Sequence, residues 1–89
     1  MFNTNGLVCP RIHDNGTSAQ TLKNDLEAVW DALELALTRC KHCAPNARDY
    51  NGPEHYDEAT DQYLDRCATI RLVQHSIERE MDAIDDQCR

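Results

Sequence analysis

Two cysteines and two histidines of this chain have the types and the spacing of metal ligands. Cys40, His42 and Cys43 fall within one four-residue segment, and His55 follows twelve residues after Cys43. Thiolate and imidazole groups are the usual ligands of structural zinc, which prefers four of them. Cys40, Cys43 and His55 therefore form a candidate zinc site that lacks a familiar fourth ligand. The alternative is that they are ordinary thiols at a helix end, beside solvated histidines.

The same residues raise the question of thiol catalysis. A catalytic cysteine needs a base within hydrogen-bonding reach, and His55 could lie that close to Cys43. Two helices and a short loop, however, offer neither a substrate pocket nor an oxyanion site. We therefore expect that the protein is not an enzyme, and that Cys67 and Cys88 are small apolar fillers.

Acidic side chains recur every three or four residues after Pro53. The first run comprises Glu54, Asp57, Glu58, Asp61 and Asp65, and a second comprises Glu78, Asp82, Asp85 and Asp86. At this spacing the carboxylates of each run share one face of a helix. Such a face is either simply solvated or binds Lys and Arg side chains of another protein. The candidate contact residues are Asp57, Glu58, Asp61 and Asp65.

The charge of the chain limits its partners. Sixteen Asp and Glu against nine Lys and Arg give a net charge of −7, which disfavours direct binding to nucleic acid. A basic or apolar groove on another protein is the natural complement. No apolar stretch has the length of a signal peptide or a membrane span. We expect a cytoplasmic protein with no membrane partner, in which the five cysteines stay reduced.

Apolar positions alternately four and three residues apart predict two helices. They are Leu22, Leu26, Val29, Leu33, Ala36 and Cys40, followed by Tyr56, Thr60, Tyr63, Cys67, Ile70, Gln74, Ile77, Met81, Ile84 and Cys88. This spacing is that of the a and d positions of a coiled coil. We expect an all-α fold, a single domain over 1–89 that forms an antiparallel two-helix hairpin. Its parts are an irregular arm over 1–16, helices over 17–43 and 53–88, and a loop over 44–52.

Capping residues mark the helix ends. The first helix is expected to start at Thr17 or Ser18, because Thr17 with Gln20 has the form of a capping box. Pro45 stops the first helix, and Pro53 suits the first turn of the second. Within the second helix, Gln74 occupies a position where a polar side chain needs polar partners and fixes the register.

The second helix is expected to be longer than the first, which leaves part of it uncovered. A hairpin whose loop turns at its middle places Trp30 beside Cys67 and leaves the residues beyond Arg79 without a facing helix. The arm is the segment that can cover them, and Cys9 would then lie near Cys88.

Several apolar residues fall outside the repeat and predict a second apolar surface. They are Trp30, Leu35, Leu37, Leu64, Leu72 and Val73. A single two-helix interface cannot bury all of them. Either a homodimer forms a four-helix bundle, or the arm and a partner protein cover this surface. Trp30, Leu64 and Val73 are the candidate partner-binding residues on it.

The segment from His42 to Glu54 reads HCAPNARDYNGPE. It resembles the hairpin loop of small uncharacterised proteins encoded in phages and prophages. The resemblance implies a two-helix hairpin and no activity, and it favours a phage product that binds and inhibits or modulates a host protein. Anti-defence inhibitors, including anti-CRISPR proteins, belong to this class. The alternatives are a zinc-stabilised helical module and a structural component of phage assembly.

Overall fold

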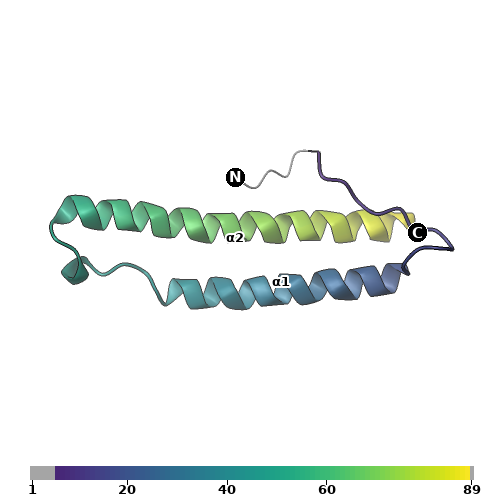
Figure 1. Ribbon diagram of the computed structural model, residues 1–89, viewed down its shortest axis with the longest axis horizontal. Coiled ribbons are helices and arrows are strands. Elements are labelled where there is room, and N and C mark those ends of the chain that lie inside the picture. Colours follow the sequence, from purple (N-terminus) through teal and green to yellow (C-terminus); the bar gives the residue numbers. More distant parts are fainter. Residues whose placement is uncertain (1–5, 89) are drawn as a thin grey trace.

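Two antiparallel helices account for most of the protein. The computed structural model describes residues 6–88, in which α1 spans Ala19–Lys41 and α2 spans Pro53–Gln87. A single 3-10 turn, η1 (Ala47–Asp49), lies between them, and the described residues contain no strand (Figure 1). The molecule is a rod of 60 × 24 × 18 Å with a radius of gyration of 17.9 Å, against about 12 Å for a compact domain of this length. The expected all-α hairpin is confirmed.

The first helix begins at a side-chain cap. Ser18 accepts a hydrogen bond from the backbone N–H of Thr21 at 3.2 Å, which satisfies one of the free donors of the first turn. Gln20 donates to Asn24 at 2.8 Å, and no hydrogen bond of a Thr17–Gln20 capping box is present. Ser18, and not Thr17, is therefore the N-cap of α1.

The segment that connects the helices runs alongside α2 instead of turning at its middle (Figure 1). It leaves α1 at His42 and reverses only at Gly52, whose φ of 88° is a conformation that favours glycine. The rings of Tyr50 and Tyr56, 6.3 Å apart, hold the segment against the start of α2. The chain therefore travels several residues further before it turns back.

This path changes the expected register of the hairpin. Lys23 near the start of α1 pairs with Asp85 near the end of α2, and Glu34 bonds to Gln74. The end of α2 is thus covered by α1, and the expectation that residues beyond Arg79 face no helix is wrong. The part of α2 that extends past α1 is its beginning, from Pro53 through about the first three turns.

The buried face of α1 is also displaced by one residue at two positions. The expected positions Leu22, Leu26, Leu33 and Cys40 are half-buried. Val29, however, is 50% exposed and Ala36 is exposed, whereas Leu37 is 3% exposed and Trp30 is half-buried. Trp30 and Leu37 keep the seven-residue spacing, and burying them removes more apolar surface than burying Val29 and Ala36. In α2 the expected repeat from Tyr56 to Ile84 is buried or half-buried, as predicted.

The N-terminal arm folds back over the C-terminal end of α2. The backbone N–H of Ile12 donates to Gln87 Oε1 at 2.8 Å, and Gln87 Nε2 donates to the carbonyl oxygen of Pro10 at 2.9 Å. Cys9 is half-buried and all five cysteines are free thiols. Cys88 is exposed, so the expectation that it is a small apolar filler is wrong, because the seam ends at Ile84. Residues 1–5 of the expected arm lie outside the described residues. The arm thus widens the covered face of α2 near its C-terminal end (Figure 1).

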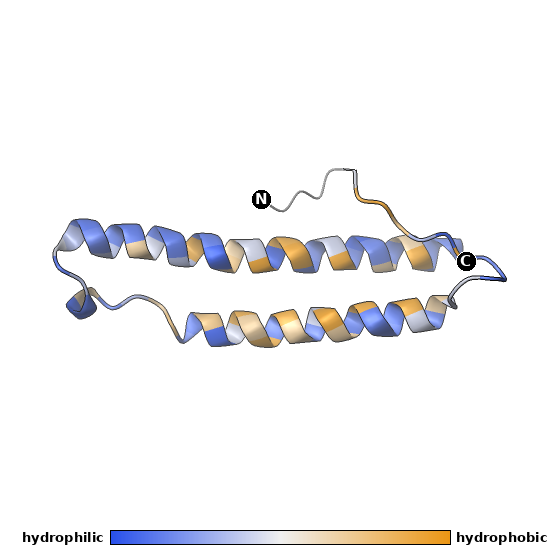
Figure 2. Ribbon diagram, viewed as in Figure 1, coloured by the Kyte–Doolittle hydropathy of each residue, from blue (hydrophilic) through white to orange (hydrophobic). Residues whose placement is uncertain are grey.

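The core itself is small. Among the described residues only Leu37, Ile77 and Ile84 are buried apolar side chains, and Gln74 and Ser76 are buried polar ones. Apolar residues are spread through the middle of α1 and the second half of α2, whereas the first half of α2 is largely hydrophilic (Figure 2). The stability of the hairpin therefore depends on a few well-buried contacts near its middle and its C-terminal end.

Truncation of a core residue should consequently cost more than a larger truncation on the surface. We expect Ile84→Val, at a position 0% exposed, to lower the free energy of unfolding by about 1 kcal/mol. The control is Leu72→Ala, at a position 44% exposed, which should cost about 0.5 kcal/mol or less. Urea unfolding followed by circular dichroism measures both. An equal or reversed order of the two effects would contradict the described packing.

Candidate functional site

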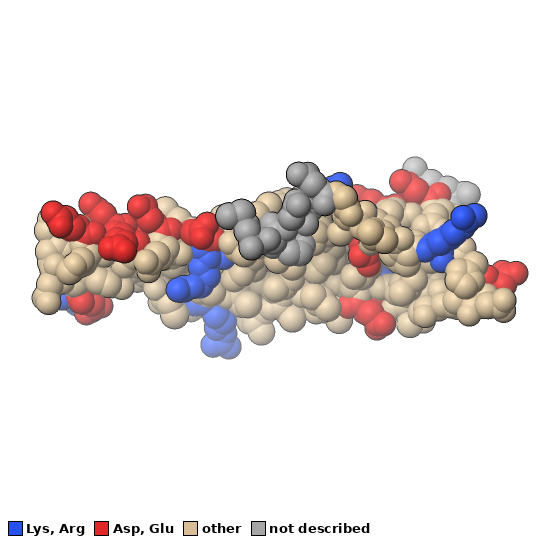
Figure 3. All heavy atoms as spheres, turned by 45° about the horizontal axis from the view of Figure 1, so that its top comes forward, with Lys and Arg blue, Asp and Glu red and all other residues tan. Residues whose placement is uncertain are grey.

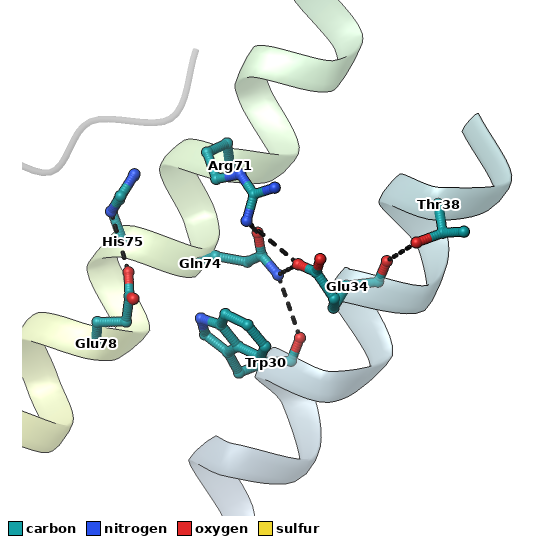
Figure 4. Close-up of polar contacts among 7 residues, drawn as sticks. All are labelled: Trp30, Glu34, Thr38, Arg71, Gln74, His75 and Glu78. Atoms are coloured by element: carbon teal, nitrogen blue, oxygen red, sulfur yellow. Dashed lines mark hydrogen bonds and ion pairs between the residues drawn. The ribbon is translucent and has the colours of Figure 1, made fainter. Parts of the chain in front are cut away.

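A polar network joins the two helices at the middle of their interface. The Gln74 side chain is 0% exposed. Its Nε2 donates to Glu34 Oε2 at 2.8 Å and to the Trp30 carbonyl oxygen at 3.4 Å, and its Oε1 accepts from Arg71 Nη1 at 2.8 Å (Figure 4). Arg71 Nη1 also lies 3.2 Å from Glu34 Oε2. The prediction that Gln74 would find polar partners is confirmed.

The electrostatics of this network favour one register. The hydrogen bond from Gln74 holds the pKa of Glu34 below its ordinary value, and the charge of Arg71 acts in the same direction against the opposing effect of burial. The Glu34–Arg71 ion pair is 42% exposed on both sides and contributes little alone. A shifted register would leave the buried Gln74 amide unpaired, at a cost of about 1–3 kcal/mol. Gln74 thus acts as the alignment point of the hairpin.

A second ion pair fixes the far end of the hairpin. Lys23 donates to Asp85 across the helices, and this hydrogen bond together with the negative charge raises the pKa of Lys23 above its ordinary value. Asp85 lies in the last turn of α2, where a carboxylate opposes the helix dipole. Lys23 supplies the positive charge that offsets this local repulsion.

The Trp30 side chain lies between the helices rather than on an open surface (Figure 4). Its Nε1 is buried and has no hydrogen-bond partner in the described part of the chain. Val73, a second candidate partner-binding residue, is half-buried, whereas Leu64 is 57% exposed. Of the remaining residues expected on a second apolar surface, Leu35 on α1 and Leu72 on α2 are exposed, whereas Leu37 is buried. Val29, which was expected at the helix interface, is also exposed.

The exposed carboxylates of the first four turns of α2 form the most distinctive surface of the molecule. This acidic overhang comprises Glu54, Asp57, Glu58, Asp61 and Asp65, and it covers the start of α2 in Figure 3. All five residues are exposed, and none forms an ion pair with any residue in the range 6–88. Most of the overhang lies beyond the end of α1, so that Leu64 is the large apolar side chain exposed beside it.

The expected zinc ligands do not come together. Because Glu34 lies opposite Gln74, the same register places Cys40 near Cys67. His55 is twelve residues before Cys67, roughly 18 Å away along the axis of α2. No group of three or more His, Cys, Asp or Glu within residues 6–88 is placed to hold a metal ion. The candidate set of Cys40, Cys43 and His55 is corrected because the connecting segment carries His55 past the end of α1.

Tyr63 lies near three cysteines at the same end of α1, an arrangement that was not predicted from the sequence. Burial raises the pKa of the Tyr63 hydroxyl above its ordinary value, and a hydrogen bond with Cys67 and the nearby Cys40 and Cys43 thiols add to the shift. Cys43 is exposed, while the other two thiols are half-buried. The correct register would have predicted this cluster, because Cys40 and Cys67 both occupy seam positions in the apolar repeat.

Comparison with known proteins identifies no related protein. No protein family, curated protein or solved structure with which the chain was compared matches it. Neither described helix has an apolar, nearly uncharged stretch long enough to cross a membrane. The surface must therefore be interpreted from its own chemistry.

The network around Gln74 predicts a specific pH dependence. Because the pKa of Glu34 is lower in the folded state, its contribution to stability is complete above the unfolded value and is lost as the pH falls through the folded value. We therefore expect the stability difference between the wild-type protein and Glu34→Gln to be largest at neutral pH. It should shrink as the pH falls from about 5 to about 3. Urea unfolding at a series of pH values measures the difference.

The matched control is Asp31→Asn, which removes an exposed carboxylate of α1 that forms no ion pair within the described range. The difference for Asp31→Asn should vary less with pH than that for Glu34→Gln. A Glu34→Gln difference that grows as the pH falls would contradict the network.

Proposed function

We propose that this protein works by binding another protein, with the acidic overhang as the contact surface. The observation that carries the proposal is the placement of five exposed carboxylates, without an internal cation, on a part of α2 that α1 leaves largely uncovered. An acidic helix of this kind fits a groove lined by Lys and Arg side chains. Exposed Leu64 supplies apolar contact at the edge of the same surface.

Repulsion among the carboxylates of the acidic overhang destabilises the isolated protein. Carboxylates one turn apart on a helix lie about 6 Å from one another and repel. The positive end of the helix dipole offsets part of this repulsion for Glu54 in the first turn, but not for Asp61 and Asp65 further along. A basic protein surface would relieve the repulsion, and this supports a partner of that chemistry. The net charge of −7 argues against nucleic acid.

The consequence of binding is proposed to be inhibition or modulation of a host protein. The resemblance of the segment from His42 to Glu54 to phage-encoded hairpins supports a host partner. Anti-defence inhibitors, including anti-CRISPR proteins, act by binding host proteins in this way. An acidic rod can occupy a basic groove that normally binds another ligand. The cytoplasmic location expected from the sequence stays a prediction.

We also propose that the protein is a homodimer that forms a four-helix bundle. The chain exposes 6759 Å², whereas a compact monomer of 10.2 kDa exposes about 5,300 Å². The excess is about 1,400 Å² by the same relation. A standard interface buries about 800 Å² on each partner, so pairing of two hairpins would remove more than half of this excess.

Neutralising the overhang should abolish partner binding. The variant carries Asp57→Asn, Glu58→Gln, Asp61→Asn and Asp65→Asn, and its net charge changes from −7 to −3 because four carboxylates are lost. We expect the immobilised wild-type protein to capture a basic protein from a lysate of the host, and the variant to capture at least about tenfold less. Quantitative mass spectrometry of the bound fraction measures both. Capture should weaken as the salt concentration rises.

A matched variant separates the overhang from charge in general. Asp14→Asn, Glu27→Gln, Asp31→Asn and Asp82→Asn produce the same change from −7 to −3 at exposed positions outside the overhang. This control should capture as much partner as the wild-type protein. If the overhang variant binds as well as the control does, the carboxylates are simply solvated and the proposed contact surface is wrong.

A further inference from the structure

One exposed face of α1 is complementary to itself. This face, called the α1 outer face below, comprises Asp25, Ala28, Val29, Ala32, Leu35, Ala36 and Arg39, and all seven residues are exposed. Val29 is 50% and Leu35 is 58% exposed. Asp25, Val29, Ala32, Ala36 and Arg39 alternate four and three residues apart. That is the spacing of a coiled-coil seam. The α1 outer face, however, lies beside the face that packs on α2 and has no partner in the described part of the chain.

The order of residues on this face is symmetric about Ala32. Asp25 precedes Ala32 by seven residues and Arg39 follows it by seven. A negatively and a positively charged side chain therefore lie at equal distances from Ala32. Val29 and Leu35 lie three residues away on either side. Two such faces that pair antiparallel therefore bring Asp25 of each copy to Arg39 of the other, and Val29 to Leu35. This is the condition for an isologous interface with two-fold symmetry.

The residues at the centre of the face suit close helix packing. Ala28, Ala32 and Ala36 have the smallest side chains that still favour a helix, so two backbones can approach to about 8 Å. Val29 and Leu35 then supply the large apolar contacts on both sides of Ala32. Asp25 and Arg39 form no ion pair within residues 6–88, so each is available for the other copy.

Charge favours the antiparallel arrangement over a parallel one. The acidic overhang lies at the hairpin end where α1 finishes. Antiparallel pairing about Ala32 places the two overhangs at opposite ends of the assembly, where they neither repel each other nor become covered. Parallel pairing would bring them together and would set Asp25 against Asp25 and Arg39 against Arg39.

We infer that a second copy of this chain docks on the α1 outer face, antiparallel about a two-fold axis at Ala32. The inference rests on the homodimer proposed above and assigns its interface. The four-helix assembly that results has the two α1 helices at its centre and presents one acidic overhang at each end. It is thus a bivalent binder with two separated contact surfaces.

Charge exchange at the two ends of the face tests the interface. Asp25→Arg places Arg opposite Arg39 in both contacts, and Arg39→Asp places two acids together. Each single variant should dimerise at least about tenfold more weakly than the wild-type protein. The double variant Asp25→Arg/Arg39→Asp should recover dimerisation. An equimolar mixture of the two single variants should form heterodimers, because both contacts are then between opposite charges. Sedimentation equilibrium measures each association constant.

The control is Asp31→Arg, which makes the same charge change at an exposed position of α1 outside the face. It should dimerise like the wild-type protein, and recovery in the mixture shows that the single variants fold. If the wild-type protein is a monomer at all concentrations, both the homodimer and its interface are wrong. If it dimerises and the single variants dimerise equally well, the homodimer stands and the α1 outer face is not its interface.

Discussion

The hydrogen-bonded amide of Gln74, buried between the two helices, is the interaction on which the rest of the structure depends. Its Nε2 donates to Glu34 and to the Trp30 carbonyl oxygen on α1, and its Oε1 accepts from Arg71 on its own helix. A buried amide tolerates no register in which these partners are lost. The apolar seam alone would allow a shift by a whole heptad, because few of its side chains are fully buried. The polar contact therefore decides which residues face one another.

That alignment divides the surfaces of the two helices into three regions. One face of each helix forms the hairpin, the start of α2 extends past α1 as the acidic overhang, and the α1 outer face stays open. The core holds only Leu37, Ile77 and Ile84 as buried apolar residues in the described range. A rod with so small a core gains most from pairing with a second copy, and the proposed antiparallel dimer leaves both overhangs free.

The helices could be predicted from the sequence because a seven-residue apolar repeat and well-placed Ser, Gly and Pro residues act locally. The polar role of Gln74 followed from the same repeat. The register could not be predicted, because it depends on how far the connecting segment runs before it turns, and the contact between Tyr50 and Tyr56 holds that segment. The expected zinc set failed for this reason. The burial of Trp30 in place of Val29 reflects side-chain size, which periodicity ignores.

The register itself is the claim that most needs a direct measurement. Nuclear Overhauser contacts in the folded protein between the Trp30 indole and side chains of α2 report it without any substitution. The Trp30 indole lies between the helices beside Gln74 (Figure 4), so the structure predicts contacts from the indole to the Gln74 side chain. Contacts from Trp30 to Cys67 instead would mean that the hairpin turns at the middle of its loop, and would contradict the alignment from which the acidic overhang and its exposure follow.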